Sequence, residues 1–166
     1  NNLNGENITD AGLAHLLNVK EIDLYVCPNI TDAGLAHLSN VKKIDLSGCK
    51  NITDAGLAHL SNVEKINLCA CQEVADAGLA HLRNVKVINL MFTNVTNAGL
   101  AHLKNVKDIC LNFCKNFTDA GLIHLSNMEK VDLSFCLGNI TDAGLVHLAN
   151  VKDINLNCTN ITDAGL

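Results

Sequence analysis

One unit of about 22 residues recurs along the whole chain and constrains the fold more than any other feature of the sequence. Its clearest copy, residues 30–51, reads ITDAGLAHLSNVKKIDLSGCKN, and further copies follow at intervals of 21 to 23 residues. Neither a linker nor a change of composition interrupts them, so we expect one array and no second domain. The copies start at Ile8, Ile30, Ile52, Val74, Val95, Phe117 and Ile140, with a shortened eighth at Ile161.

Each unit predicts a short helix followed by a short strand. Leu35 and Leu38 are three positions apart and share one face of a helix, whereas Ile44 and Leu46 alternate with the polar Asp45, as in a strand. One strand and one short helix cannot bury a core alone. Neighbouring units must therefore stack, with the strands in a parallel sheet and the helices covering one side of it.

Capping residues stand at both ends of the predicted helix. Thr31 or Asp32 can accept a hydrogen bond from a free N–H at its start. Asn40 ends the helix in a position that tolerates left-handed backbone. Gly34 lies inside the helix, where glycine destabilises by about 1 kcal/mol relative to alanine. We therefore expect this glycine to allow close approach of the next helix.

The apolar spacing resembles the leucine-rich repeat pattern L-x-x-L-x-L-x-x-N/C-x-L. VKKIDLSGCKNITDAGL, residues 41–57, resembles the cysteine-containing subtype of F-box-type substrate receptors, and GLAHL resembles repeat arrays of amoeba-associated bacteria. The resemblance, which extends from Leu3 to the end of the chain, implies an α/β solenoid of about seven repeats. Its curved parallel sheet would form the concave face and its short helices the convex face. We expect residues 1–166 to be one array and a fragment without capping repeats, in which 1–7 end one repeat and 161–166 begin another.

Five of the eight cysteines occupy one slot of the unit, three residues after the last leucine of the strand. Threonine holds this slot in the two shortest copies, and threonine can neither ligate zinc nor form a disulfide. In the leucine-rich repeat family the slot points inward and bonds the backbone at the turn, so we expect a structural ladder, no metal site and no cofactor. The ladder comprises Cys27, Cys49, Cys71, Thr93, Cys114, Cys136 and Thr159.

All seven histidines fall in the slot of GLAHL or of its near copies GLIHL and GLVHL. On a helix that buries Leu13 and Leu16, His15 points to the convex outside. The equivalent histidine of the next copy lies on a neighbouring helix, about 8–10 Å from the first. This distance is too long for two ring nitrogens to share one zinc ion at about 2.1 Å each. We therefore interpret these histidines as a property of the repeat.

Composition and charge limit the classes of partner and the cellular compartment that we expect. The formal net charge is −5, and lysines alternate with acids along the chain, which argues against a nucleic-acid footprint. No apolar run approaches the roughly 18 residues of a membrane span, and the start of the sequence does not resemble a signal peptide. Free thiols favour a reducing compartment, intracellular and cytoplasmic.

Residues that depart from the repeat mark the candidate binding surface. Phe92, Phe113 and Phe135 hold one slot in three consecutive copies, and with strands about 4.8 Å apart they are expected to stack into a stripe. Exposed aromatic clusters mark binding sites; the alternative is that these rings fold over the turn and cover backbone. Asp108 and Asp132 would face basic groups of the partner. The candidate partner-binding residues are Tyr25, Met91, Phe92, Phe113, Phe135, Asp108 and Asp132.

We predict a protein–protein interaction scaffold that binds another protein on the concave strand face, and no catalytic residue set. One alternative is the substrate-recognition segment of a ubiquitin-ligase adaptor or bacterial effector whose other domains lie outside this sequence. A second is a self-assembling structural repeat protein whose uncapped ends associate head to tail. Light scattering over a concentration series distinguishes a monomer from open-ended growth.

Overall fold

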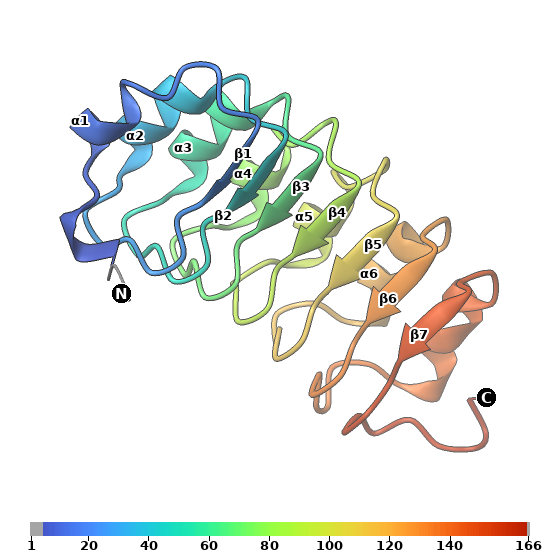
Figure 1. The fold of residues 1–166 in the computed structure, drawn as a ribbon. Helices are drawn as coiled ribbons and strands as arrows, with labels where there is room; N and C mark the ends of the chain where they lie inside the picture. Colours follow the sequence, from blue (N-terminus) through green and yellow to red (C-terminus); the bar gives the residue numbers. More distant parts are fainter. Residues whose placement is uncertain (1–4, 166) are drawn as a thin grey trace.

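The computed structural model describes residues 5–165 and shows them as a single curved row of stacked repeats (Figure 1). Within these residues, seven parallel strands form one sheet in chain order, and the helices lie behind it. The expected α/β leucine-rich repeat solenoid is confirmed. Leu3, which the sequence assigns to a preceding repeat, lies outside the described residues. The strands are β1 (Glu21–Asp23), β2 (Lys43–Asp45), β3 (Lys65–Asn67), β4 (Val87–Asn89), β5 (Asp108–Cys110), β6 (Lys130–Asp132) and β7 (Asp153–Asn155).

Each strand follows a helix that is shorter than the sequence pattern suggests. Most repeats contain one four-residue α-helix, which 3-10 turns continue in three copies, and the last helix is 3-10 throughout. Helices this short are marginal in isolation, so packing on the sheet must hold them. The helices are η1 (Gly5–Asn7), α1 (Asp10–Leu13), α2 (Asp32–Leu35), η2 (Ala36–Leu38), α3 (Asp54–Leu57), η3 (Ala58–Leu60), α4 (Asp76–Leu79), α5 (Asn97–Leu100), α6 (Asp119–Leu122), η4 (Ile123–Leu125) and η5 (Asp142–Leu148).

Equivalent residues of successive repeats lie side by side in the sheet. Ile44 pairs with Ile66, and Ile66 with Ile88, so each position of the unit forms a row across the strands. The pairing continues past the three strand residues, since the Leu46 N–H donates to the Asn67 carbonyl at 2.9 Å. A residue that differs from its neighbours in one row is therefore displayed beside them.

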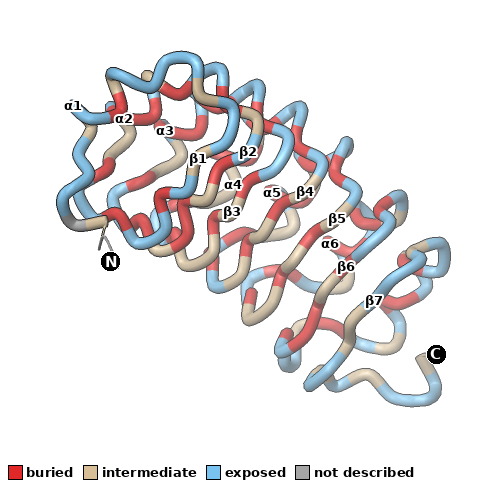
Figure 2. Tube along the Cα trace, viewed as in Figure 1, coloured by how far each residue is buried: buried red, intermediate tan, exposed pale blue. Residues whose placement is uncertain are grey.

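The core is a continuous aliphatic column between sheet and helices (Figure 2). Ile44, Leu46, Leu35 and Leu38 are each 4% exposed or less, and the equivalent residues of the inner repeats behave alike. Phe117 occupies the first position of its repeat and is fully buried. It is thus a core residue, unlike the other three phenylalanines.

A ladder of carboxylates and threonines ties each helix to the next repeat. Thr53 caps its own helix, because its hydroxyl accepts from the Ala55 N–H at 3.2 Å. Asp32 does not cap: its two carboxylate oxygens accept from the Thr53 N–H at 2.9 Å and the Thr53 hydroxyl at 2.6 Å, one repeat away. Asp10, Asp76, Asp119 and Asp142 bond the following threonine in the same way.

The glycine of each helix makes room for this carboxylate. A Cβ built on Gly56 would lie 2.9 Å from Cγ of Asp32 and 3.1 Å from Cδ1 of Leu35, with Oδ1 of Asp32 closer still. The expected close approach is present, but the group that approaches is the aspartate of the preceding repeat. Gly12 differs, because nothing described lies within 4 Å of its hypothetical Cβ.

The asparagine that ends each helix forms a second connection between repeats. The Asn62 amide donates to the Ser39 carbonyl at 3.1 Å, and Asn40, Asn84 and Asn105 donate likewise to the repeat before. None of these asparagines has the left-handed backbone that the position tolerates. Among the described residues, positive φ occurs instead in the turn after the strand, apart from Gly138. Asparagine is therefore used for its amide donor.

The carboxylate ladder makes stability depend on pH. Hydrogen bonds from the Thr162 hydroxyl and N–H lower the pKa of Asp142 below its usual 3.8. A lowered pKa contributes stability that is present above about 3.8 and lost as pH falls through the folded-state value. We expect Asp142→Asn to melt below the wild type at pH 6 and this difference to shrink below pH ~4. Melting curves across pH test this, and a constant difference would contradict it.

Candidate partner-binding surface

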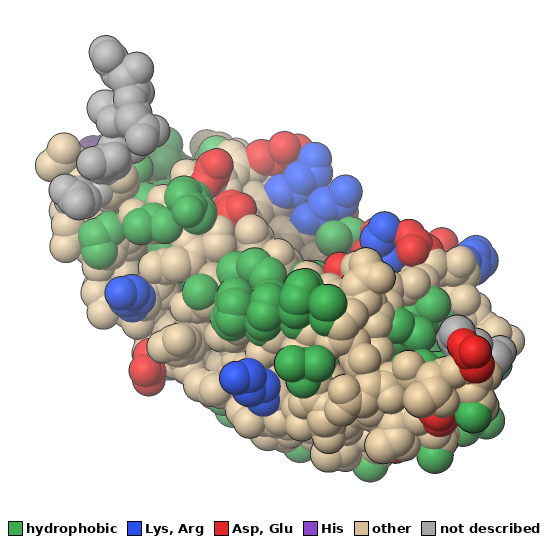
Figure 3. All heavy atoms as spheres, turned by 90° about the horizontal axis from the view of Figure 1, so that it is seen from below, with side chains coloured by type: hydrophobic (Ala, Val, Ile, Leu, Met, Phe, Trp, Pro, Cys, Tyr) green, Lys and Arg blue, Asp and Glu red, His purple; other side chains and the backbone are tan. Residues whose placement is uncertain are grey.

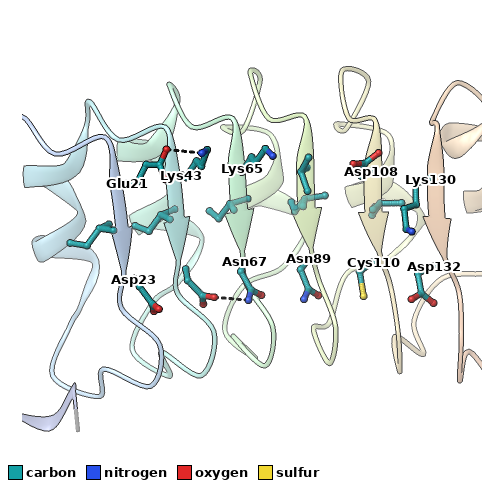
Figure 4. A pocket seen from close by; sticks show the side chains of 17 residues that line it. Glu21, Asp23, Lys43, Lys65, Asn67, Asn89, Asp108, Cys110, Lys130 and Asp132 are labelled. Carbon is teal, nitrogen blue, oxygen red and sulfur yellow. Dashed lines mark hydrogen bonds and ion pairs between the residues drawn. The ribbon is translucent and has the colours of Figure 1, made fainter. Parts of the chain in front are cut away.

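A groove of about 780 Å³ crosses β1 to β6 on the concave face of the sheet (Figure 4). Each strand contributes its three residues or most of them, and the first and third carry the side chains that Figure 4 labels. The first residues form one row across the groove and the third residues form another. The first row is Glu21, Lys43, Lys65, Val87, Asp108 and Lys130, and the second is Asp23, Asp45, Asn67, Asn89, Cys110 and Asp132.

Charges in the first row are paired at both ends and unpaired in the middle. Nζ of Lys43 lies 2.6 Å from Oε1 of Glu21, and Nζ of Lys130 lies 2.6 Å from Oδ2 of Asp153 in β7. Within residues 5–165, neither Lys65 nor Asp108 has an opposite charge within 4.0 Å. The centre of the groove therefore presents one cation and one anion that no intramolecular ion pair occupies.

Most side chains of the second row accept a backbone hydrogen bond in the turn that ends their strand. Oδ1 of Asp45 accepts from the Ser47 N–H at 2.8 Å, and the same bond two residues on is made by Asp23, Asn67, Asn89, Asp132 and Asn155. Asp and Asn side chains favour such turns. This row therefore has a structural role in the turns that follow the strands. Cys110 is the one residue of the second row that is neither aspartate nor asparagine.

Asp132 also forms hydrogen bonds within its own repeat and with the repeat before it. Its Oδ1 accepts from the Ser134 hydroxyl at 2.8 Å, and the amide nitrogen of Asn112, turned toward the carboxylate, lies 2.6 Å from the same oxygen. Little of this carboxylate is left for a basic group of another molecule. Of the two predicted aspartates, Asp108 is the one whose charge is available.

Three phenylalanines follow the strands and stack along the rim of the sheet. The rings of Phe92 and Phe113 are 4.4 Å apart between centroids and 14° from parallel, and those of Phe113 and Phe135 are 4.5 Å and 9°. Phe92 and Phe135 are 45% and 39% exposed, so the stack is only partly covered. Figure 3 views the edge of the solenoid at which the strands end and shows hydrophobic side chains gathered into a ridge there.

The backbone at this slot is one that phenylalanine rarely adopts. Phe92, Phe113 and Phe135 have φ of 58°, 60° and 61°, and Gly48 has 75° at the equivalent position. The Cys49 N–H donates back to the Leu46 carbonyl at 2.9 Å, which is the hydrogen bond of a turn with glycine preferred at its third residue. Left-handed backbone costs a residue with a side chain about 1–2 kcal/mol. The turn therefore does not explain the aromatic rings.

The remaining predicted residues lie at different places on the surface. Met91 is the residue before Phe92 and is partly exposed. Tyr25 is 65% exposed but belongs to the turn after β1, three strands away from β4. The structure thus brings Met91 and the phenylalanines together on the rim, places Asp108 in the groove, and leaves Tyr25 apart.

The cysteine slot forms an internal ladder of thiols and backbone carbonyls. The Cys49 thiol lies 3.1 Å from the Leu24 carbonyl of the preceding repeat, and Cys71, Cys114 and Cys136 bond the preceding repeat likewise. Thr93 instead donates to Leu90 of its own repeat at 2.7 Å, and Thr159 does the same with Leu156. Cys27, at the first turn, lies 3.8 Å from the Tyr25 carbonyl.

Burial should make the slot thiols inert. Desolvation raises the pKa of Cys49 to about 11 and those of Cys71 and Cys136 to about 12, and the thiolate is the reactive form. Cys158 is exposed. At pH 7 we expect maleimide to label Cys158 first and the slot cysteines only after denaturation, as read by mass spectrometry. Equal labelling of Cys71 and Cys158 in the folded protein would contradict this.

The histidines lie on the helix side, away from the groove. His15, His59, His81, His102 and His124 are exposed, and His37 and His147 are half-buried. Across residues 5–165, no three His, Cys, Asp or Glu side chains are grouped so that they could hold a metal ion. In the same part of the chain, no helix is long and apolar enough to span a membrane.

Comparisons with known proteins agree with this architecture. A family model described as "Leucine Rich repeat" matches residues 37–61 and 147–166, and a search of curated proteins gives no match. A chain of the Rad7–Elc1 complex of yeast is 18% identical, with a TM-score of 0.59 over 98% of this chain and 43% of that one. The internalin InlF of Listeria monocytogenes is 18% identical, with a TM-score of 0.63 over 92% and 52%. A chain of the Drosophila Toll–Spätzle complex is 16% identical, with a TM-score of 0.60 over 93% and 29%.

The repeat pattern, the sheet and these matches define a leucine-rich repeat solenoid. The chain spans about half, or less, of the length of each of these three structures. At these identities the similarity establishes the fold alone. The cysteine-containing subtype rests on the sequence motif.

Proposed function

We propose that the chain is a protein–protein interaction module whose partner lies in the concave groove and reaches over the rim onto the phenylalanine stack. The groove supports this most directly, because Lys65 and Asp108 flank the apolar Val87 at its centre and neither has an opposite charge within 4.0 Å among residues 5–165. Solenoids present such extended concave surfaces for binding.

The phenylalanine stack supports the same proposal independently. A partly exposed row of aromatic rings is typical of a binding surface, and aromatic anchors carry much of the energy of interfaces. Here the rings stand at backbone positions better suited to glycine, such as Gly48. A role in binding accounts for a side chain that the turn itself disfavours.

A protein is the class of partner that the comparisons favour. Two of the structures named above, Rad7–Elc1 and Toll–Spätzle, are complexes between two proteins. The mixed charges of the groove suit a polypeptide surface, which carries charges of both signs. An adaptor or effector role for a longer protein would use this same surface and is a narrower form of the proposal.

Site-specific photo-crosslinking in the source cell tests the binding surface. A benzophenone amino acid at Val87 samples the groove, and the same amino acid at His59 samples the exposed helix side. We expect a discrete crosslinked protein from position 87 and none from position 59. Crosslinks from position 59 alone, or none from position 87, would overturn the proposal.

A further inference from the structure

Lys65, Val87 and Asp108 stand next to one another in the first row of the groove. Lys65 pairs with Val87 between β3 and β4, and Val87 with Asp108 between β4 and β5. Figure 4 shows the two charged side chains on either side of the sheet centre. This cation–apolar–anion order is fixed by the register of three strands rather than by a flexible loop.

The spacing of the two charges selects among ligand conformations. Two strand spacings of about 4.8 Å place the two residues about 9.6 Å apart. In a polyproline II segment, residues i and i+3 lie on the same edge and about 9.3 Å apart, at three residues per turn and 3.1 Å per residue. In a β-strand, same-face residues lie about 6.7 or 13 Å apart, two or four positions on.

The second row offers a hydrogen-bond donor beneath these charges. Oδ1 of Asn89 accepts from the Met91 N–H at 2.9 Å, which fixes the amide plane. Its Nδ2 donates to no other group among residues 5–165, although Asn67 uses its own Nδ2 to bond Asp45 at 2.8 Å. Because a polyproline II backbone has no internal hydrogen bonds, its carbonyls are free to accept from such a donor.

We propose that the centre of the groove binds a polyproline II segment of the partner protein through an acidic residue on Lys65 and a basic residue three positions away on Asp108. An apolar residue between them contacts Val87, and a backbone carbonyl accepts from Asn89. The ion pairs at the two ends of the row already satisfy Lys43 and Lys130. This inference rests on the proposed function and adds the chemistry of the segment that is recognised.

Selection from a displayed library of random 12-residue peptides tests the inference with two matched proteins. One is the wild type and the other is Lys65→Glu with Asp108→Lys, which reverses the pair and keeps the net charge at −5. We expect wild-type peptides to carry opposite charges three positions apart and the reversed protein to select the opposite order. A wild-type peptide should bind the reversed protein at least tenfold more weakly, since both contacts become repulsive, and salt should reduce the difference.

The control protein carries Lys104→Glu and Glu73→Lys, a reversal outside the groove with the same net charge. It should bind the selected peptides as the wild type does. NMR shift changes at β3 to β5 would place the peptides in the groove. Groove-bound peptides without charge order, or with charges spaced two, four or seven apart, overturn the inference and leave the proposed function standing. Peptides that bind only elsewhere, or no enrichment, overturn the inference, while the crosslinking experiment decides the function separately.

Discussion

Gly56→Ala is expected to lower the free energy of unfolding by about 2–4 kcal/mol, because the new Cβ displaces the carboxylate that joins two repeats. Asp32 would have to move, since its Cγ lies 2.9 Å from that Cβ position, and would lose its bonds of 2.9 and 2.6 Å to Thr53. A hydrogen bond to a charged group contributes about 1.5–3 kcal/mol. The better helix propensity of alanine offsets about 1 kcal/mol of the loss.

Gly12→Ala is the matched control for this experiment. Gly12 stands at the same position of its helix, and nothing described lies within 4 Å of its hypothetical Cβ. Its replacement should therefore leave stability unchanged or raise it by up to about 1 kcal/mol. Denaturant unfolding of both variants measures the difference. Equal effects at the two positions would show that the carboxylate contact does not require glycine.

Phe117→Ala is expected to destabilise the fold by about 3–5 kcal/mol, which is the usual cost of removing a phenylalanine side chain from a packed core. Phe117 is fully buried at the start of its repeat. Phe113→Ala should remove about 1–3 kcal/mol, from two ring contacts of about 0.5–1.5 kcal/mol each. Ala70 already occupies the equivalent slot with φ of 60°, so alanine fits this backbone.

Urea unfolding of Phe117→Ala and Phe113→Ala, compared with the wild type, tests this contrast. The buried substitution should cost at least about 1 kcal/mol more than the one on the rim. If Phe113→Ala proved the more damaging, the stack would be part of what holds the turns together. The alternative in which the rings serve to cover backbone would then be preferred.

Periodicity alone predicted the parts of this molecule that depend on one unit. The alternation around Asp45 located the strand, the three-residue step from Leu35 to Leu38 located the helix, and the common slot of the phenylalanines indicated a stack. The structure places those rings 4.4 and 4.5 Å apart. In a stacked array, neighbours in one slot are neighbours in space, so register follows from the sequence.

Contacts between repeats were harder to predict, because they depend on how two units sit against each other. Asp32 was interpreted as a possible cap of its own helix, whereas its carboxylate bonds the next repeat. Asn40 was interpreted as tolerating left-handed backbone, which occurs instead at the turn after the strand, where Gly48 was the available signal.

Of the two central charges of the groove, Asp108 was predicted from the sequence and Lys65 was not. The signal for Lys65 is its place in the first row of strand residues, where Val87 and Asp108 follow it in the next two copies. Which charges of this row are paired depends on side-chain geometry, such as the 2.6 Å approach of Lys43 to Glu21. Asp132 was likewise expected to face a partner, but its contact with the Ser134 hydroxyl commits it to the turn.

We claim that binding is carried by residues that depart from the repeat rather than by the repeat itself. The affinity of the crosslinked partner for Phe113→Ala/Phe135→Ala tests this claim. With folding verified by circular dichroism, calorimetric titration should show binding at least tenfold weaker than the wild type, since aromatic anchors at interfaces contribute about 2 kcal/mol or more each. Unchanged affinity in the folded double variant would contradict the claim.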